Sequence, residues 1–348
     1  MNPPALVTGA PGWLGSRLVQ LLVTGLADVP ALASPAPRRI RCLVLAGTPA
    51  AALAALPPAV ELVEGDVRDP RSLVPFVRAA AGATLFHLGG VVTTRRLQDY
   101  DDVNVEGTRH VLHAAVGAGV ARVIGISSDT VVGWNHRSDG VFDESAPPRP
   151  HLAYGRSKHR MEELLREAFA AGRLETVVVR PCRFYGPGQP LARTRLYRLM
   201  RQGRLPIFGG GRNLCSLSYL DNVCQVLLLA ERTGRAAGGT YWVADRRPYP
   251  MIEIVATVRR LAGELGLPVN GRGLHLPGAV ARGAARIERL LDRLGLRDER
   301  LHAVAHLGST IVCSSAKAER ELGYEPTVEL EEGLRRALCW SRDHGQPL

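Results

Sequence analysis

A glycine-rich turn near the beginning of the chain restricts its fold more than any other feature. The apolar run Ala5–Thr8 leads into Thr8–Gly15, which reads T-G-x-x-G-x-x-G, and a helical pattern follows through Thr24. Glycine permits a tight strand-to-helix turn and lets backbone N–H groups approach an anion at the helix N-terminus. We interpret the segment as the first unit of a parallel α/β sheet that holds a dinucleotide pyrophosphate; the alternative is a turn that is merely tight.

Segments typical of strands and helices alternate as far as Pro181. Short apolar runs typical of strands cover Ala5–Thr8, Arg39–Leu45, Val60–Glu64, Thr84–Leu88, Val120–Ser127 and Glu175–Arg180. Apolar residues at helical spacing cover Gly12–Thr24, Val103–Ala118 and Tyr154–Ala171. Strands separated by helices at these distances predict an α/β fold built on a Rossmann doubly wound parallel sheet.

The composition changes after Pro181, where shorter, mixed elements carry many Gly, Pro and Arg residues. We therefore expect a dinucleotide-binding Rossmann domain over residues 1–181. A smaller mixed α/β C-terminal region over residues 182–348 is expected to bind mainly the substrate, and some of its segments are expected to return to the first domain.

The composition also excludes several classes of protein. The formal net charge is +11, and only Lys158 and Lys317 of the 44 basic residues are lysine. Because the arginines are spread along the chain and aromatic residues make up 5%, we expect anionic ligands and no nucleic-acid partner. No apolar run reaches about 18 residues, so no transmembrane segment is expected. Six cysteines without metal-ligand spacing, and an N-terminus without a secretory signal, predict a cytoplasmic protein without a metal site.

Two further segments predict that a cofactor lies across the carboxyl edge of the sheet. Asp66 in Gly65-Asp66-Val67 follows the third strand and could accept a hydrogen bond from an adenine amino group. His87-Leu88-Gly89-Gly90 ends the fourth strand, where small residues let a cofactor pass close to the backbone. The end of the second strand, Leu43–Thr48, has neither a carboxylate nor an arginine to select the ribose, so NAD(H) and NADP(H) both remain candidates.

The chemistry is predicted by a tyrosine and a lysine four residues apart. Tyr154 and Lys158 lie on one face of a predicted helix, so the phenol and the ammonium point the same way. A nearby cation stabilises a phenolate and moves the tyrosine pKa toward neutral pH. Ser128 follows the fifth strand, on the edge that faces the ligand, and could hydrogen-bond the substrate oxygen.

Taken together, the motifs resemble those of the extended short-chain dehydrogenase/reductases over nearly the whole chain. Beyond the segments above, the matching pieces are Asn104–Thr108, Arg180-Pro181, Tyr185–Gly188, Tyr219–Val223 and Glu321–Pro326. The 3β-hydroxysteroid dehydrogenase-like and dihydroflavonol reductase-like branch is the most similar. The resemblance implies that Tyr154 is the acid/base, that Lys158 binds the nicotinamide ribose and that Ser128 orients the substrate. The cofactor-binding residues that follow from the motifs and the resemblance are Thr8, Gly9, Pro11, Gly12, Trp13, Leu14, Gly15, Asp66, Val67, Leu88, Gly89, Gly90, Asn104, Tyr154, Lys158 and Pro181.

Departures from the family's sugar-nucleotide members narrow the expected substrate. Dehydratases carry Thr-Asp-Glu where this chain has Ser128-Asp129-Thr130, and sugar-nucleotide enzymes tend to place an arginine where this chain has Cys215. Epimerases usually read Tyr-Gly where this chain has Val132-Gly133. We expect interconversion of a ketone and a secondary alcohol on a hydrophobic small molecule. An epimerase that acts by transient oxidation is the alternative, with a nucleotide sugar as a candidate substrate. A non-catalytic dinucleotide sensor or nucleic-acid-binding relative is the third.

One predicted helix has a role that the sequence leaves open. Pro277–Leu294 has apolar residues at helical spacing and arginines mostly on the other side, which fits a core helix, a lid over an apolar substrate or a helix on a membrane surface. The segments expected to line the substrate pocket are Leu191–Met200, Leu205–Phe208 and Pro277–Leu294. Family members often dimerise through helices that correspond to Val103–Ala118 and Tyr154–Ala171, so a homodimer is expected.

Overall fold

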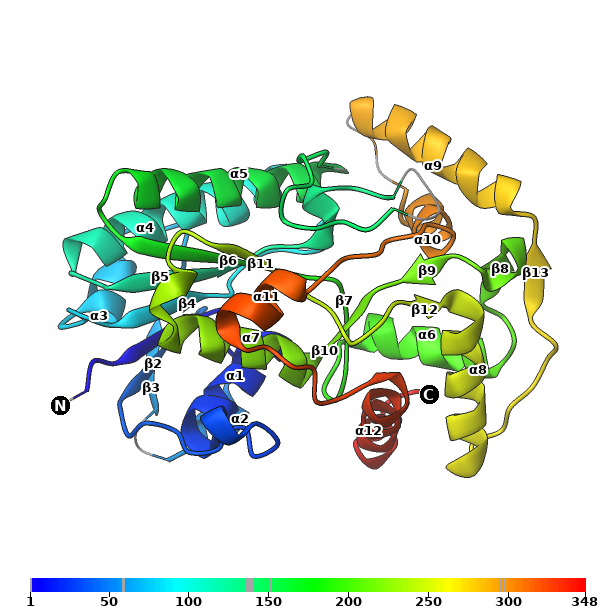
Figure 1. Cartoon of the computed structure of the whole chain (residues 1–348), viewed down its shortest axis with the longest axis horizontal. Coiled ribbons are helices and arrows are strands. Elements are labelled where there is room, and N and C mark those ends of the chain that lie inside the picture. Colours follow the sequence, from blue (N-terminus) through cyan, green and yellow to red (C-terminus); the bar gives the residue numbers. More distant parts are fainter. Residues whose placement is uncertain (1, 58–59, 136–139, 151, 295, 297) are drawn as a thin grey trace.

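A parallel sheet flanked by helices forms one end of the molecule, and a smaller mixed part forms the other (Figure 1). The computed structural model describes residues 2–57, 60–135, 140–150, 152–294, 296 and 298–348. Within these residues the main sheet has seven strands, all parallel, in the order β11-β6-β5-β4-β1-β2-β3. Their bounds are β1 Ala5–Thr8, β2 Ile40–Val44, β3 Val60–Glu64, β4 Thr84–His87, β5 Arg122–Ile126, β6 Glu175–Pro181 and β11 Thr240–Val243.

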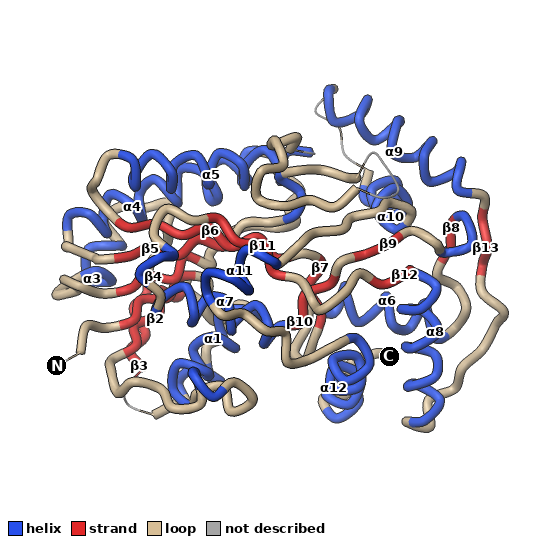
Figure 2. The backbone as a smooth tube through the Cα atoms, viewed as in Figure 1, coloured by secondary structure: helices blue, strands red, loops and turns tan. Residues whose placement is uncertain are grey.

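Helices cover both faces of this sheet, which Figure 2 shows as a continuous red layer between two sets of blue helices. One face packs against α1 (Trp13–Thr24), α2 (Ala51–Ala54), α7 (Leu220–Arg232) and α11 (Ala316–Leu322). The other packs against α3 (Leu73–Val77), α4 (Gly107–Gly117), which a π-helical segment precedes, and α5 (Leu152–Ala170). Because both faces are covered, the central strands β1, β5 and β6 are buried along nearly their whole length and mostly apolar instead of alternating.

The smaller part has its own apolar core between α6 (Leu191–Arg201), α8 (Met251–Glu264) and α12 (Leu330–Asp343). Two helices, α9 (Gly278–Arg293) and α10 (Glu299–Leu307), pack on each other at its upper edge in Figure 1. Three two-stranded sheets complete it and pair β7 (Arg183–Tyr185) with β10 (Leu217–Tyr219), β9 (Leu214–Cys215) with β12 (Tyr249–Pro250), and β8 (Pro206–Phe208) with β13 (Leu274–Leu276).

The predicted Rossmann α/β fold is confirmed, and each of the six predicted strands lies within two residues of its expected bounds. The seventh strand, β11, was not predicted, and it comes from the second half of the chain together with α7 and α11. Segments beyond residue 181 therefore do return to the sheet. The division into residues 1–181 and 182–348 remains our proposal for the two functional parts.

The apolar side of α5 is used inside the molecule. Met161 and Leu165 are buried and pack against the sheet and α4. Leu164 is partly buried against the same cluster. The face that favoured a homodimer is therefore largely covered within one chain, and the homodimer stays a prediction without this support.

The helix α9 has an arrangement that sequence analysis did not predict. Its buried side consists of Ala281, Ala284, Ala285 and Glu288, whereas Ile287 and the other large apolar residues that follow helical spacing are mostly exposed. Small alanines let α9 approach α10 closely, so the larger side chains are left on the outside. The core-helix interpretation of Pro277–Leu294 is therefore wrong for these large residues. Within the described part of the chain, no helix is both long and apolar enough to cross a bilayer.

Candidate active site

The glycine-rich turn joins β1 to α1 with the close backbone approach that its sequence predicts. The N–H of Gly12 donates to the carbonyl of Gly9 over 2.9 Å. A Cβ atom at Gly12 would lie 2.6 Å from that oxygen, and one at Gly15 would lie 2.4 Å from it. No side chain fits at these two positions, so the backbone at the start of α1 stays accessible. The turn therefore has the shape that a pyrophosphate needs in order to reach backbone N–H groups.

A buried histidine fixes the strand end beneath this turn. The Nδ1 of His87 lies 2.8 Å from Thr8 Oγ1, and its Nε2 lies 3.0 Å from Thr108 Oγ1. Thr108 already donates its hydroxyl proton to the carbonyl of Asn104, so Nε2 must carry the imidazole proton and Nδ1 must accept. Burial, followed by the charge of Lys158, lowers the His87 pKa to about 3. Thr8 in turn accepts from the N–H of Gly89 over 3.1 Å, so a neutral histidine links the two cofactor turns.

Asn104 positions the loop that follows β4. Its amide oxygen accepts from the N–H of Val91 over 2.8 Å, and its Nδ2 donates to the carbonyl of the same residue over 3.0 Å. Nδ2 also lies 2.9 Å from the hydroxyl of Ser157 on α5. A Cβ at Gly90 would lie 2.9 Å from the Asn104 amide oxygen and 3.7 Å from Lys158 Nζ. Asn104 thus supports the cofactor loop from behind and keeps it beside the catalytic helix.

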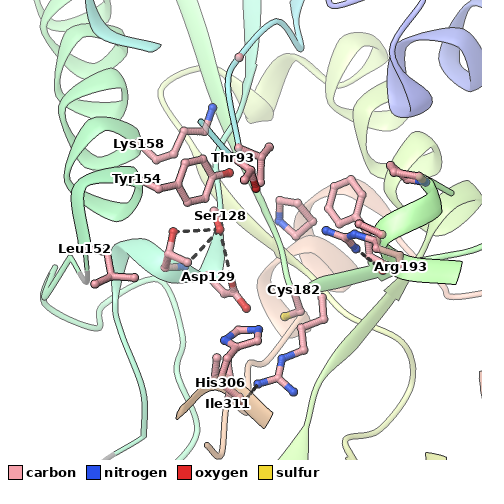
Figure 3. A pocket seen from close by; sticks show the side chains of 18 of the residues that line it. Thr93, Ser128, Asp129, Leu152, Tyr154, Lys158, Cys182, Arg193, His306 and Ile311 are labelled. Carbon is pink, nitrogen blue, oxygen red and sulfur yellow. Dashed lines mark hydrogen bonds between the residues drawn. The ribbon is translucent and has the colours of Figure 1, made fainter. Parts of the chain in front are cut away.

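Tyr154 and Lys158 lie one turn apart on α5, as predicted, and both face the cavity (Figure 3). Burial lowers the pKa of Lys158 to about 8, while the charge of Glu162 acts in the opposite direction. Burial raises the pKa of Tyr154 to about 12, which is opposite to the shift toward neutral pH that the sequence predicted, and only the hydrogen bond with Ser128 and the charge of Arg193 oppose it. The phenol is therefore protonated at neutral pH and is available as a proton donor.

Ser128 lies at the carboxyl end of β5, directly below the Tyr154 hydroxyl in Figure 3. Its hydroxyl donates to Asp129 Oδ1 over 3.0 Å and accepts from the N–H and the hydroxyl of Thr130 over 3.2 and 3.0 Å. These contacts fix the Ser128 oxygen in place. A rotation of its proton away from Asp129 would let it donate to a substrate oxygen.

Asp66 and Val67 differ from the other predicted cofactor residues because they lie away from the main cavity. Both carboxylate oxygens of Asp66 accept hydrogen bonds from Arg68, whose guanidinium lowers the Asp66 pKa. The Val67 side chain packs against Gly107, where an added Cβ would lie 2.7 Å away. An adenine amino group would therefore meet Asp66 already paired with an arginine.

One cavity of about 790 Å³ joins the two parts of the molecule, and most of its wall is apolar. The predicted site residues that line it are Gly9, Gly12, Trp13, Leu14, Gly15, Leu88, Gly90, Ser128, Tyr154, Lys158 and Pro181. Thr8, Gly89 and Asn104 support it through the hydrogen bonds above, and the carbonyl of Pro11 accepts from Ser16 over 2.9 Å. Of the three segments predicted for the substrate pocket, those in α6 and α9 contribute to its wall. Leu205–Phe208 does not, because Leu205 and Ile207 line a separate, smaller pocket between β8 and α8.

Sequence analysis missed several charged residues that line the same cavity, among them Asp129, Arg183 and Arg193. Asp129 is buried, and its Oδ2 has no hydrogen-bond partner among the described residues. Burial raises its pKa, opposed first by the charge of Arg183 and also by that of Arg193. Arg193 lies across the cavity from Tyr154 in Figure 3, with its guanidinium 5.5 Å from the ring centre of Trp13. The position of Asp129 directly after Ser128 is a signal that could have identified it. Nothing in the sequence around Arg183 and Arg193 distinguishes them from the other arginines.

Metal-ligating side chains do not gather anywhere in the described part of the chain, where no group of three or more His, Cys, Asp or Glu residues converges. All six cysteines are free, and Cys215 is buried against the guanidinium of Arg183, with Sγ 3.0 Å from Nη1.

Comparisons with known proteins agree with this geometry. The model of the NAD dependent epimerase/dehydratase family matches residues 5–244. The uncharacterized protein y4nL of Sinorhizobium fredii is 39% identical over 99% of this chain and 96% of its own length. The 2-alkyl-3-oxoalkanoate reductase of Stenotrophomonas maltophilia is 31% identical over 79% of this chain and 84% of its own. The crystal structure of gox2253 superposes with a TM-score of 0.80, at 25% identity and over the whole of both chains.

The chain belongs to the NAD dependent epimerase/dehydratase family, which confirms its predicted resemblance to the extended short-chain dehydrogenase/reductases. It is an enzyme of the NAD-dependent oxidoreductase and epimerase type. The expectation of a nicotinamide dinucleotide is confirmed at the level of the family, and the glycine turn supplies a fitting cradle.

Proposed function

We propose that this enzyme interconverts a ketone and a secondary alcohol on a hydrophobic small molecule. The observation that carries the proposal is the position of Ser128, Tyr154 and Lys158 on one wall of a large, mostly apolar cavity. The similarity to a protein named as an oxoalkanoate reductase supports the same reaction class, because that substrate name combines a ketone with an alkyl chain.

The cofactor in this proposal is NAD(H) or NADP(H), held by the turn between Gly9 and Gly15 and by the loop at Gly90. When bound, the nicotinamide would supply or accept the hydride. Lys158 would bind the ribose hydroxyls, since its ammonium is buried beside Gly90 and its lowered pKa reflects an unsolvated cation in need of hydrogen-bond acceptors. Asn104 would keep the Gly90 loop in place.

The proton would move at the Tyr154 hydroxyl. In the direction of reduction, the phenol donates its proton to the oxygen of the substrate carbonyl while Ser128 donates a hydrogen bond to the same oxygen. The resulting phenolate is stabilised by the ammonium of Lys158 one turn away. In the direction of oxidation, the phenolate removes the proton of the alcohol. Lys158 is buried and Tyr154 is partly buried, so few water molecules compete for the phenolate.

The rest of the substrate would rest on apolar side chains from the smaller part of the molecule. Leu196, Met200, Leu217 and Ile254 line this end of the cavity. Burial of apolar area contributes about 25 cal/mol per Å², which suits a steroid-like, polyketide-like or long-chain ketone. We further propose that the enzyme works as a homodimer in the cytoplasm.

A substrate screen tests the proposal. Purified enzyme is incubated with apolar ketones and secondary alcohols, each with NAD(H) and NADP(H), and net turnover is followed by nucleotide absorbance. We expect turnover of at least one apolar carbonyl class, with a preference for one of the two dinucleotides. UDP- and dTDP-sugars are included in the same screen, because they are the substrates that the alternative epimerase would convert. A UDP-sugar that binds at micromolar concentration and is converted without net cofactor redox would replace this proposal with the epimerase.

A further inference from the structure

The outer surface of α9 combines exposed apolar residues with arginines. At 3.6 residues per turn, Val280, Ile287, Leu290 and Leu294 fall on one stripe, and each side chain is 45–65% exposed. We call these four residues the apolar stripe. The arginines form a second, adjoining stripe, also exposed, which consists of Arg282, Arg286, Arg289 and Arg293.

The charge on the exposed side of α9 is entirely positive. The helix has two acidic residues, and both point toward the body of the protein. Glu288 is buried, and Asp292 pairs with Arg156 on α5, with Asp292 Oδ2 2.6 Å from Arg156 Nη1. A partner of this surface therefore meets apolar side chains bordered by guanidinium groups, which complements a layer that is apolar inside and anionic at its surface.

The apolar stripe is continuous with the mouth of the catalytic cavity. Leu291 lies next to the stripe on the helix and lines the cavity. Leu296, just beyond the helix, also lines the cavity while 57% of it is exposed. In Figure 1, α9 stands at the margin of the molecule, with α10 beneath it. An apolar path thus leads from the outer surface of α9 into the cavity.

We propose that α9 docks this enzyme on the surface of a membrane that contains anionic lipid. The apolar stripe enters the boundary between headgroups and acyl chains, and the arginine stripe binds lipid phosphates. The cavity mouth then opens at the lipid surface, so an apolar molecule dissolved in the bilayer reaches the site without crossing water. The docking surface itself is independent of which ketone or alcohol is converted.

Vesicle sedimentation with the full-length protein tests this inference. We expect binding to vesicles of phosphatidylcholine and phosphatidylglycerol in equal parts to exceed binding to pure phosphatidylcholine by at least about tenfold, and to weaken with salt. Replacing Ile287 and Leu290 together by Glu should abolish it. Arg286→Gln and Arg293→Gln should each weaken it roughly fivefold, the equivalent of about 1 kcal/mol per arginine.

Val74→Glu is the matched control, because Val74 is 66% exposed on α3, at the opposite end of the molecule in Figure 1. It should bind vesicles like the wild type. Circular dichroism and thermal unfolding verify that each variant is folded. Absence of binding to the anionic vesicles, or equal binding by the Ile287/Leu290 double variant, would overturn the inference. So would light scattering that shows a dimer for the wild type and a monomer for the double variant, because the stripe would then join two copies of the chain.

Discussion

Arg156 and Asp292 connect the catalytic helix to the outermost helix of the molecule. Arg156 lies between Tyr154 and Lys158 on α5, and its Nη1 is 2.6 Å from Asp292 Oδ2 on α9. Asp292 also lines the cavity, so the ion pair spans its edge. A movement of α9 away from α5 would have to break this ion pair. The pair therefore holds α9 beside the catalytic helix at the edge of the cavity.

Removing the ion pair between Arg156 and Asp292 should change substrate binding more than the chemical step. The Arg156 side chain is 50% exposed, and exposed pairs contribute about 0–1 kcal/mol, so Arg156→Gln should raise KM by up to about fivefold and leave kcat nearly unchanged. Steady-state kinetics on the best substrate from the screen measure both constants. The exchange Arg156→Asp with Asp292→Arg should restore KM. A fall in kcat without a change in KM would show that Arg156 acts on the chemistry instead.

Tyr154→Phe should lower kcat by roughly 10²–10⁴-fold, because the variant has no proton to donate to the substrate oxygen. Cofactor affinity, measured by nucleotide fluorescence, should change little. Tyr241→Phe on β11 is the control, since the hydroxyl of that buried tyrosine bonds to Glu321 away from the cavity. Near-normal turnover in the Tyr154 variant would remove it from the mechanism.

Gly12→Val should abolish binding of the dinucleotide. Its Cβ alone would meet the carbonyl oxygen of Gly9 at 2.6 Å, so the turn must move or distort where the pyrophosphate is expected. Calorimetric titration with NAD(H) and NADP(H) measures the loss. Gly117→Val, at an exposed position on α4 with no atom within 4 Å of the added Cβ, should bind normally. If both variants bind equally, the glycine turn has only a structural role.

Arg180→Met should destabilise the protein by about 3–5 kcal/mol, because it leaves the buried carboxylate of Glu162 without its main partner. Two hydrogen bonds of 2.8 and 2.6 Å join these side chains, and Ser127 next to the catalytic serine donates to the same carboxylate. Urea denaturation measures the free energy of unfolding. Replacing Glu162 by Leu in the same chain should recover most of the loss. The exposed pair of Arg335 and Glu264 is the control, and Arg335→Met should change stability by less than about 1 kcal/mol.

Asp245 should make stability depend on pH below neutrality. Burial raises its pKa from 3.8 to about 7, against hydrogen bonds from Tyr219, Tyr185 and Asn222. The native state therefore holds a proton between about pH 4 and 7 that the unfolded state has released, and the free energy of unfolding falls as pH rises through this window. Asp245→Asn, which has the same shape and no titration, should flatten the profile. Urea midpoints at pH 5 and pH 8 decide this, and an unchanged slope in the variant would contradict the assignment.

The sequence by itself determined the first half of the sheet and the reacting groups. The strands from β1 to β6, the glycine turn and the Tyr154–Lys158 pair each have a local sequence pattern: apolar runs, glycine positions and helical spacing. The order of these segments also predicted that Ser128 and Tyr154 would meet, since parallel strands end at the same edge.

Only the tertiary structure decided the remainder. The strand β11 has four residues and lies among the shorter, mixed elements beyond Pro181, and its pairing with β6 at the edge of the sheet is visible only in the folded chain. Asp129 becomes a buried acid with a free oxygen only because the smaller part of the molecule closes over it. The large apolar residues of α9 have the period of a core helix, yet its alanines make the contact with α10, and Ile287 and Leu290 face outward. Periodicity shows that a helix has two sides, and packing decides which of them is buried.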